Sequence, residues 1–416
     1  MTRKHPGNRQ ITLEMLSPEP AVPFTSAEYE NRIERVKTSM RASNIDILYA
    51  ASPDSLLYLT GYEALWYQYQ VLEHWVPISG VAIHVDADQP ILFENDAEKN
   101  LCRYRTSVRD IRILERHDMK LIDFIVSELK SQGWAKGTLG LEMYAIRPPR
   151  AVSEQFQSKM EQAGVSKTVD ATHIVNGVKH IKSPQELAFV RTASRIAEVG
   201  HEAARNAIQP GATELDVWAE VMGAMGHAGG ENPGITIPVA SGSKSSIPHS
   251  MPSRRVLCAG DIVNVDVCAV YNRYHADCSR SYSIGEPHPD VADAVSKAAG
   301  AFDVLGETAK PEMLVQEVAE ALKRYYEEVG LTGEQWWTGG YDLGASMPPD
   351  WVGPWSWDIE VDNGEKRFEE GMVVNYESDF YLPRGAGLTL LIDTMLFEAG
   401  AMDFPVRTPR ELSVVE

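Results

Sequence analysis

The chain has 416 residues, of which 44% are hydrophobic and 24% charged, so it has enough apolar material for two packed cores. Its formal net charge of -20 argues against nucleic acid or an anionic membrane as a partner, because binding to phosphate groups needs clustered Lys and Arg. No stretch approaches the roughly 18 consecutive apolar residues of a membrane span, and the polar N-terminus lacks the apolar centre of an export signal. We therefore expect a soluble, cytoplasmic protein.

The first 24 residues are polar and interrupted by prolines, and we predict that residues 1–24 form an arm. From residue 25 to residue 178, helical and extended patterns alternate, which predicts a small α/β domain. Helices are expected at 26–45 (capped by Ser26), 119–132 and 153–163, and strands at 46–50, 80–85, 89–94, 137–142 and up to about 169. Residues 54–70 are expected to be a strand or a helix edge that turns at Gly61 into an aromatic-rich loop.

A hinge near His180 starts a second domain, residues 179–416. Ser183 and Pro184 predict the cap and first turn of a long helix ending near 208, and Thr213 precedes a second helix. The sequence then changes to strands at 235–240, 261–271, 277–284 and 372–397, with helices at 290–305 and 314–329. We expect an α+β domain in which helices pack on one side of a curved antiparallel sheet.

Three stretches of the second domain carry side chains suited to chemistry. The first contains His249, which follows a Gly/Ser-rich loop that leaves a strand, where a side chain faces a cleft. Because the pKa of an unperturbed imidazole is about 6.5, His249 is a candidate proton shuttle. The alternative is a structural histidine.

The second stretch places Asp266 in the middle of an apolar strand, where an unpaired carboxylate is costly to bury. Asp277 follows after a turn and can return on the neighbouring strand. Two such carboxylates hold a cation, share a proton, or divide the roles of acid and nucleophile. The alternative is a pair of buried salt bridges to Arg273 or Arg280.

The third stretch places Glu377 within another strand, where an apolar residue would be less costly to bury. Alone, Glu377 could be a buried hydrogen-bonding acid. It follows His249 and the two aspartates in the chain, and the three stretches together form an ordered set.

This ordered set resembles the pita-bread superfamily, which includes methionine aminopeptidase, prolidase, aminopeptidase P, creatinase and ectoine hydrolase. Residues 25–178 resemble the extra α/β domain of the creatinase and aminopeptidase P branch, and SPQELAFVRTA, at 183–193, resembles its hinge helix. The resemblance covers nearly the whole chain. It implies a C-terminal pita-bread domain preceded by a smaller creatinase-type α/β domain.

In the metallopeptidases of this superfamily, two aspartates, a histidine and two glutamates hold two metal ions. The corresponding positions here, in that order, are Asp266, Asp277, Tyr341, Glu377 and Ile392. Asp393 is no replacement for the missing glutamate, because adjacent strand residues face opposite sides. Three carboxylates suit a pair of transition-metal ions poorly, so we expect no catalytic metal, with a single Mg²⁺ or Ca²⁺ as the alternative.

Creatinase and ectoine hydrolase keep the fold and the histidine but work without metal. The segments LTGYEALWYQYQ, YNRYHADCSRSY and GGYDLGASMPPDW look like those of ectoine hydrolase. The resemblance implies a hydrolase of a non-peptide C–N bond in a small zwitterionic compound, either an ectoine-like cyclic amidine or a creatine-like guanidino acid. His249 would shuttle the proton, and Asp266 or Glu377, beside Asp277, would act as nucleophile or base. Asp266 stands where ectoine hydrolase has a glutamate.

The resemblance also implies residues that bind the substrate. Tyr341, Trp351 and His275 are expected at the site of the same subunit. Tyr62 and Trp66 belong to a loop that reaches the neighbouring subunit's site in creatinase-like dimers. We therefore expect a homodimer with a small-molecule substrate and no cofactor.

Three alternatives stay open. A metal-dependent Xaa-Pro peptidase of the aminopeptidase P or prolidase type requires a two-metal site. A lyase acting on a small betaine-like compound belongs to a branch that keeps the metal ligands, which this chain lacks. A non-catalytic binding protein predicts loss of the proton shuttle, whereas His249 and both aspartates are present.

Overall fold

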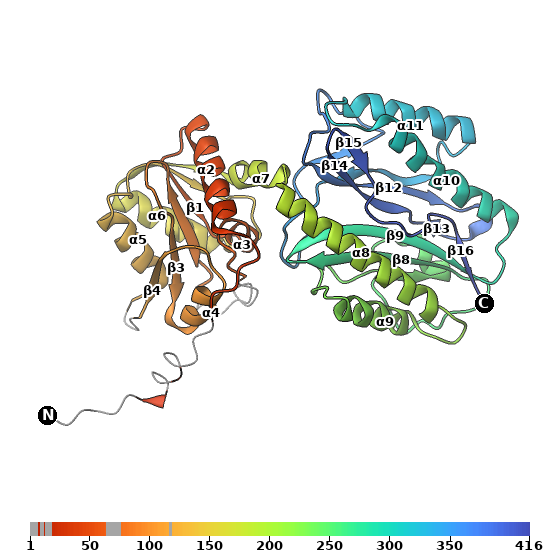
Figure 1. The fold of residues 1–416 in the computed structure, drawn as a ribbon, viewed down its shortest axis with the longest axis horizontal. Coiled ribbons are helices and arrows are strands. Elements are labelled where there is room, and N and C mark those ends of the chain that lie inside the picture. The colour runs from red at the N-terminus through yellow and green to blue at the C-terminus, as the bar shows by residue number, and fades with distance from the viewer. Residues whose placement is uncertain (1–6, 9–11, 13–18, 64–75, 116–118) are drawn as a thin grey trace. The chain divides into compact units, whose positions relative to one another are not determined.

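The computed structural model describes every residue except 1–6, 9–11, 13–18, 64–75 and 116–118. The chain divides into two compact units, Met1–Val178 and Lys179–Glu416, each with its own sheet (Figure 1). Within the described ranges, no helix combines the length and the hydropathy that crossing a membrane requires.

In the N-terminal unit, described strands form a six-stranded sheet in the order β4-β3-β2-β1-β5-β6. The strands are β1 Ile47–Ala50, β2 Gly80–His84, β3 Ile91–Asn95, β4 Asp110–Leu114, β5 Gly137–Leu141 and β6 Val165–Asp170. The helices are α2 Ser26–Ala42, α3 Pro53–Thr60, α4 Lys99–Tyr104, α5 Leu121–Ser131, α6 Arg150–Ala163 and α7 Thr172–His180. Apolar side chains of α5 and α6 pack on the sheet in one core that includes Tyr49, Phe93 and Phe156. The predicted α/β architecture is confirmed.

Two local predictions in this unit need refinement. The cap of α2 is Thr25 rather than Ser26, since the Thr25 hydroxyl accepts the backbone N–H of Glu28 at 3.3 Å. The segment predicted as a strand or a helix edge is the helix α3, which ends at Gly61 in the left-handed conformation (φ +80°). A Cβ there would meet the Tyr29 hydroxyl at 2.8 Å, so both backbone angle and space favour glycine.

In the C-terminal unit, described strands form a ten-stranded sheet whose main path is β11-β10-β12-β14-β9-β8-β7. The strands are β7 Val239–Ser241, β8 Ile262–Tyr271, β9 Tyr274–Ile284, β10 Gln335–Tyr341, β11 Ser356–Asp358, β12 Val373–Tyr381, β13 Leu388–Thr389, β14 Ile392–Glu398, β15 Ala401–Asp403 and β16 Ser413–Val415. The helices are α8 Pro184–Ala207, α9 Glu214–His227, α10 Pro289–Thr308 and α11 Val315–Val329. The predicted strand at 235–240 is wrong in extent, because only Val239–Ser241 pair with β8.

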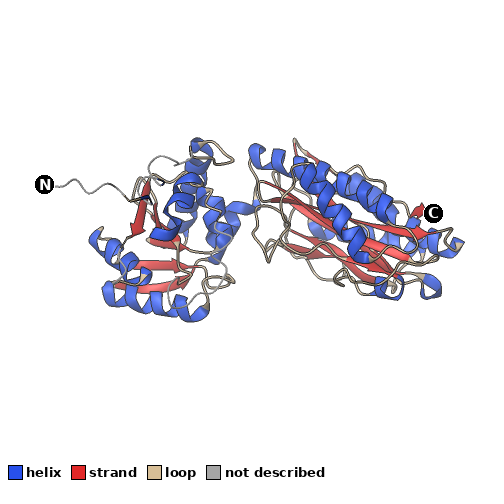
Figure 2. Cartoon of the chain, turned by 90° about the horizontal axis from the view of Figure 1, so that it is seen from below, coloured by secondary structure: helices blue, strands red, loops and turns tan. Residues whose placement is uncertain are grey.

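Strand alternation gives the C-terminal sheet two different faces. Apolar residues of β8 such as Val263 and Val265 pack with α8 and α9, and Val374 and Tyr376 of β12 pack with α10 and α11. Figures 1 and 2 show the ribbons of these helices and strands. The intervening residues of the same strands lie on the other face, which is polar. The prediction that helices pack on one side of an antiparallel sheet is confirmed, and the candidate site residues lie on the opposite face.

Candidate active site

The strand register brings the predicted residues together in two neighbouring rows across the helix-free face. One row, running from β8 to β10, contains Asp266, Ser279, Ile392, Glu377 and Gly339. The adjacent row contains Cys268, Asp277, Thr394, Asn375 and Tyr341. Three acids predicted from separate stretches, Asp266, Asp277 and Glu377, are therefore neighbours on one face.

The side-chain amide of Asn375 lies between two of these acids. Its Nδ2 donates to Oδ2 of Asp277 at 2.8 Å and to Oε1 of Glu377 at 3.0 Å. Its Oδ1 accepts the backbone N–H of Tyr341 at 2.7 Å, which fixes the orientation of the amide. The Tyr341 hydroxyl donates to the same Oδ2 of Asp277 at 3.1 Å. Two neutral donors thus occupy the space between the carboxyl groups.

A fourth acid, Asp379, extends this group along β12 on the face of Glu377. Desolvation and the neighbouring negative charges raise the pKa of Asp266, Glu377 and Asp379 well above the usual range. Desolvation also raises the pKa of Asp277 to about 6, against the hydrogen bonds from Asn375 and Tyr341. Because like charges this close together disfavour simultaneous ionisation, the raised pKa values favour protonated carboxyl groups within this cluster.

The alternative of buried salt bridges to Arg273 or Arg280 is wrong for these acids. Arg273 donates to the backbone oxygens of Ser346 and Asn232. Arg280 pairs with Asp393 at 2.9 Å on the other face of the sheet. This pairing also confirms that Asp393 faces away from the row of Ile392. Among the described residues, no ion pair involves any of the four clustered acids.

His249 lies outside the sheet, on the loop that follows β7, and its side chain is exposed. The ring makes an edge-to-face contact with Trp336 of β10, with ring centroids 5.5 Å apart. Strands β7 and β10 lie toward opposite ends of the main strand path, so this contact requires the curvature of the sheet. The ring of His249 is thus accessible from solvent.

Aromatic rings flank the two rows. Tyr341 stacks on Trp337 with centroids 6.2 Å apart and contacts Trp351 at 6.3 Å. Burial, followed by the charges of the neighbouring acids, raises the pKa of the Tyr341 phenol well above its usual value. Gly340 permits the close approach of the strands, because a Cβ there would lie 1.9 Å from the carbonyl oxygen of Asn375. Tyr341 therefore lies beside Asp277, and Trp351 contacts the Tyr341 ring; their role in binding substrate stays a prediction.

The prediction that His275 binds substrate needs correction. Its side chain is fully buried, its Nε2 accepts the backbone N–H of Gly234 at 3.3 Å, and its Nδ1 bonds the Gly344 carbonyl at 3.2 Å. Desolvation, followed by the charge of Arg273, lowers the pKa of His275 to about 3. A neutral imidazole with both nitrogens engaged holds two loops in place and has no free group for a ligand.

The two predicted residues of the N-terminal loop have different outcomes. Tyr62 is fully buried, and its hydroxyl donates to Oε2 of Glu94 at 2.7 Å. It faces the interior of the N-terminal unit rather than a surface that a neighbouring subunit could reach, so this prediction needs correction. Trp66 lies outside the described residues. The expected dimer, with this loop near the neighbouring site, stays a prediction.

The positions that hold metal in the superfamily's metallopeptidases lack the donor set of a two-metal site here. Tyr341 occupies the histidine position, and its hydroxyl donates a hydrogen bond to Asp277 instead of offering a lone pair to a metal ion. Ile392 places an apolar side chain next to Glu377 in its row. Within the described residues, no group of three or more His, Cys, Asp or Glu side chains is arranged to hold a metal ion. A pair of metal ions therefore does not fit these residues.

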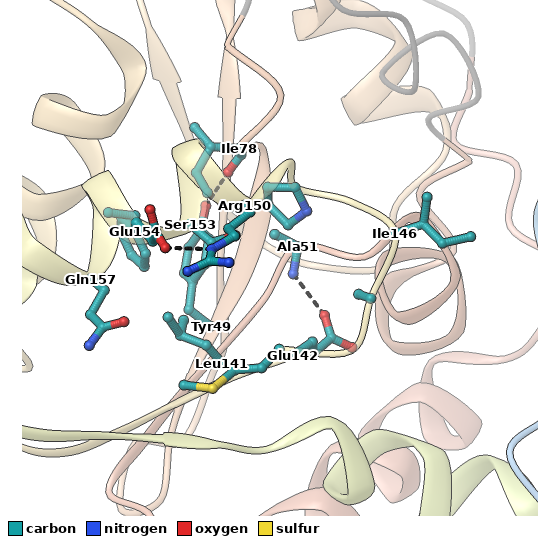
Figure 3. A pocket seen from close by; sticks show the side chains of 14 residues that line it. Tyr49, Ala51, Ile78, Leu141, Glu142, Ile146, Arg150, Ser153, Glu154 and Gln157 are labelled. Carbon is teal, nitrogen blue, oxygen red and sulfur yellow. Dashed lines mark hydrogen bonds and ion pairs between the residues drawn. The ribbon is translucent and has the colours of Figure 1, made fainter.

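A separate pocket of about 430 Å³ lies in the N-terminal unit, beside the end of β5 (Figure 3). Tyr49 and Phe156 form part of its apolar floor. Its charged groups are engaged: Arg150 pairs with Glu154 at 2.6 Å, and Glu142 accepts backbone N–H groups at the start of α3. None of the predicted site residues lines this pocket.

Sequence reasoning missed three residues of the site. Asn375, Glu377 and Asp379 are spaced two residues apart along β12 and therefore lie on one face. This spacing could have identified Asn375 and Asp379 as neighbours of Glu377. The third is Thr394, whose hydroxyl accepts the backbone N–H of Asp277 at 2.8 Å and donates to its carbonyl at 2.9 Å. The partner of Thr394 is 117 residues away, so no local pattern could identify it.

Comparisons with known proteins identify the family of the chain. Residues 188–399 match the model of metallopeptidase family M24, and residues 32–181 match the creatinase/prolidase N-terminal domain. The chain is 26% identical to the ectoine hydrolase of Halomonas elongata, over 92% of this chain and 98% of that protein. It is 25% identical to the Xaa-Pro dipeptidase of Pyrococcus furiosus, over 92% of this chain and 99% of that protein.

Among solved structures, the prolidase of Pyrococcus horikoshii has the same fold. It superposes with a TM-score of 0.76 at 21% identity, over 92% of this chain and 99% of that one. Family model, fold and the ordered set of acids agree. The chain belongs to metallopeptidase family M24, and in this chain a creatinase/prolidase N-terminal domain precedes the pita-bread domain.

Proposed function

We propose that this chain hydrolyses a C–N bond other than a peptide bond in a small zwitterionic compound, without a catalytic metal ion. The observation that carries the proposal is the Asn375 amide, which donates to both Asp277 and Glu377. An N–H group there neutralises part of the negative charge that a cation would otherwise balance. The bond-breaking work then falls to protein side chains.

Hydrolysis needs a group that activates the nucleophile and a group that protonates the leaving nitrogen. Asp266 and Glu377 are 8% and 6% exposed, whereas Asp277 and Asp379 are fully buried, so the first two are the acids that a substrate reaches. One of them takes a proton from the attacking water, or attacks the carbon itself and is released by water in a second step. His249 gives the leaving nitrogen its proton.

The same acids favour a cationic group in the substrate. Without a ligand, Asp266 and Glu377 keep their protons, because burial and like charges disfavour ionisation. An amidinium or guanidinium group bound beside them favours their ionised forms, and the ring faces of Tyr341 and Trp351 add a cation–π contact. An ectoine-like cyclic amidine and a creatine-like guanidino acid both meet this requirement.

Similarity to ectoine hydrolase supports this proposal, and similarity to Xaa-Pro dipeptidases favours a second candidate, a metal-dependent dipeptidase. The two relatives match at nearly equal identity, so identity does not separate the candidates. The donor set does: a dipeptidase needs ligands at the positions of Tyr341 and Ile392. That requirement supports the metal-independent hydrolase, which we favour; the choice between the two candidates is left to experiment.

A substrate screen tests the proposal directly. Purified protein would be incubated with ectoine, hydroxyectoine, creatine and a Xaa-Pro dipeptide, each with and without chelator, and the products would be separated by chromatography. We expect turnover of a cyclic amidine or a guanidino acid that chelator leaves unchanged. Cleavage of the dipeptide that chelator abolishes would establish the dipeptidase instead.

A further inference from the structure

Glu214 is a fully buried acid at the first position of α9, and it lies outside the cluster of four acids. It accepts the backbone N–H and the hydroxyl of Ser241 at 3.0 and 2.7 Å, and those of Ser253 at 3.0 and 2.6 Å. The ammonium group of Lys244 also donates to it. The Glu214 carboxylate therefore accepts hydrogen bonds from five donor groups.

These donors come from both ends of the loop that carries His249. Ser241 is the last residue of β7, and Ser253 lies beyond the histidine. Lys244 reinforces the closure, because it also donates to the carbonyl of Met251 at 3.0 Å and to the hydroxyl of Ser253 at 3.2 Å. The loop from 241 to 253 is closed on Glu214.

The charge state of Glu214 suits this role. Burial alone would raise its pKa, but the hydrogen bonds from Lys244, Ser253 and Ser241 outweigh burial, so the pKa is lowered. The group is ionised at neutral pH, and hydrogen bonds to a carboxylate are stronger than those between neutral groups.

Two further hydrogen bonds hold the middle of the loop: Asn264 donates to the Ser245 carbonyl at 3.3 Å, and the backbone N–H of Ser250 donates to the Ile247 carbonyl at 3.0 Å. Ile247 and Met251 on either side of the histidine are 55% and 51% exposed. Within the described residues, His249 makes the ring contact with Trp336 but no hydrogen bond. Besides these bonds, the position of the imidazole depends on the ends of its loop.

We propose that Glu214 is a positioning residue for His249: by closing both ends of the 241–253 loop on one buried carboxylate, it fixes where the imidazole stands. The functional part of this inference rests on the proposed role of His249 as proton shuttle. The geometric part, that Glu214 orders the imidazole, does not depend on it.

The test compares Glu214→Gln with Glu220→Gln, which changes an exposed acid of the same helix. The glutamine keeps the volume but removes the charge and one acceptor oxygen, so the side-chain link between Ser241, Lys244 and Ser253 is weakened. The backbone bond from Leu215 to the Ser253 carbonyl remains. Imidazole NMR of ¹⁵N-histidine protein, assigned with His249→Ala, reports the order of the ring without any substrate. We expect the His249 signal to broaden or split in Glu214→Gln and to stay unchanged in Glu220→Gln.

Kinetics provide the second readout once a substrate is known. Misplacement of the proton shuttle should lower kcat of Glu214→Gln about ten- to a hundredfold, with KM within about threefold of the wild type. A variant with a lower Tm but an unchanged His249 signal would show that Glu214 only stabilises the fold, and would overturn the proposal.

If Glu214→Gln does not fold, Ser253→Ala tests the same point, because it removes one donor at one end of the loop. An ordered, unshifted His249 signal in that variant would also overturn the inference. Failure of the proposed function is recognised separately. In that case His249→Ala keeps full activity, or no compound is turned over. The NMR comparison of Glu214→Gln with the wild type tests the ordering of His249 independently of these outcomes.

Discussion

Replacing Asn375 by aspartate should destabilise the C-terminal unit strongly, although the two side chains have nearly the same shape. The substitution removes the two hydrogen bonds that the amide donates to Asp277 and Glu377. A bond to an ionised carboxylate contributes about 1.5–3 kcal/mol and a neutral one about 1 kcal/mol, so the loss is about 3 kcal/mol. For a domain of this size, that loss corresponds to a fall in Tm of about 6–12 °C.

The assay is thermal unfolding at neutral pH, with and without Mn²⁺. Asn206→Asp adds the same charge at an exposed position of α8 and should change the free energy of unfolding by less than about 0.5 kcal/mol. Because a carboxylate in place of the amide supplies lone pairs between two acids, Mn²⁺ should raise the Tm of Asn375→Asp but not that of the wild type. An Asn375→Asp protein as stable as the wild type without metal would refute the reasoning.

Three further predictions concern individual residues. His249→Ala should lower kcat about a hundred- to ten-thousandfold with Tm unchanged, since the side chain is exposed; more than about a tenth of the activity remaining would exclude the shuttle role. Tyr341→Phe removes a donor to Asp277 and should lower the free energy of unfolding by about 1.5–3 kcal/mol, measured by urea denaturation; an unchanged midpoint would show that this bond contributes nothing. The pKa of Asp277 is about 6 when folded and about 3.9 when unfolded, so this group costs the wild type stability as pH rises from about 4 to 6. Asp277→Asn lacks that loss, and the stability of the variant relative to the wild type should increase by about 3 kcal/mol across this window; a constant difference would contradict the raised pKa.

The parts of the fold that sequence predicted well depend on local patterns. The cap at Ser183 is an example, because the Ser183 side chain and Glu186 form a reciprocal capping box at the start of α8. The position of Asp266 and Asp277 on the same face of the sheet likewise follows from strand alternation across the short β8–β9 hairpin. In both cases the deciding contacts lie within a few residues or across one turn.

The two corrected substrate-binding predictions concern residues whose partners are distant in the chain. The ring nitrogens of His275 form hydrogen bonds with the backbones of Gly234 and Gly344, which are 41 and 69 residues away. The phenol of Tyr62 pairs with Glu94, 32 residues away. The sequence does not show whether the hydrogen-bonding groups of a side chain already have a partner within the protein. A buried polar or aromatic residue can therefore be mistaken for a ligand-binding residue.

Diffraction from crystals soaked in Mn²⁺ tests the central claim most directly, since anomalous scattering locates the ion without assumptions about substrate. We expect no Mn²⁺ between Asp266, Asp277 and Glu377, with the Asn375 amide still within hydrogen-bond distance of the last two. Two well-ordered Mn²⁺ ions bound among these carboxylates, with the amide of Asn375 displaced, would contradict it.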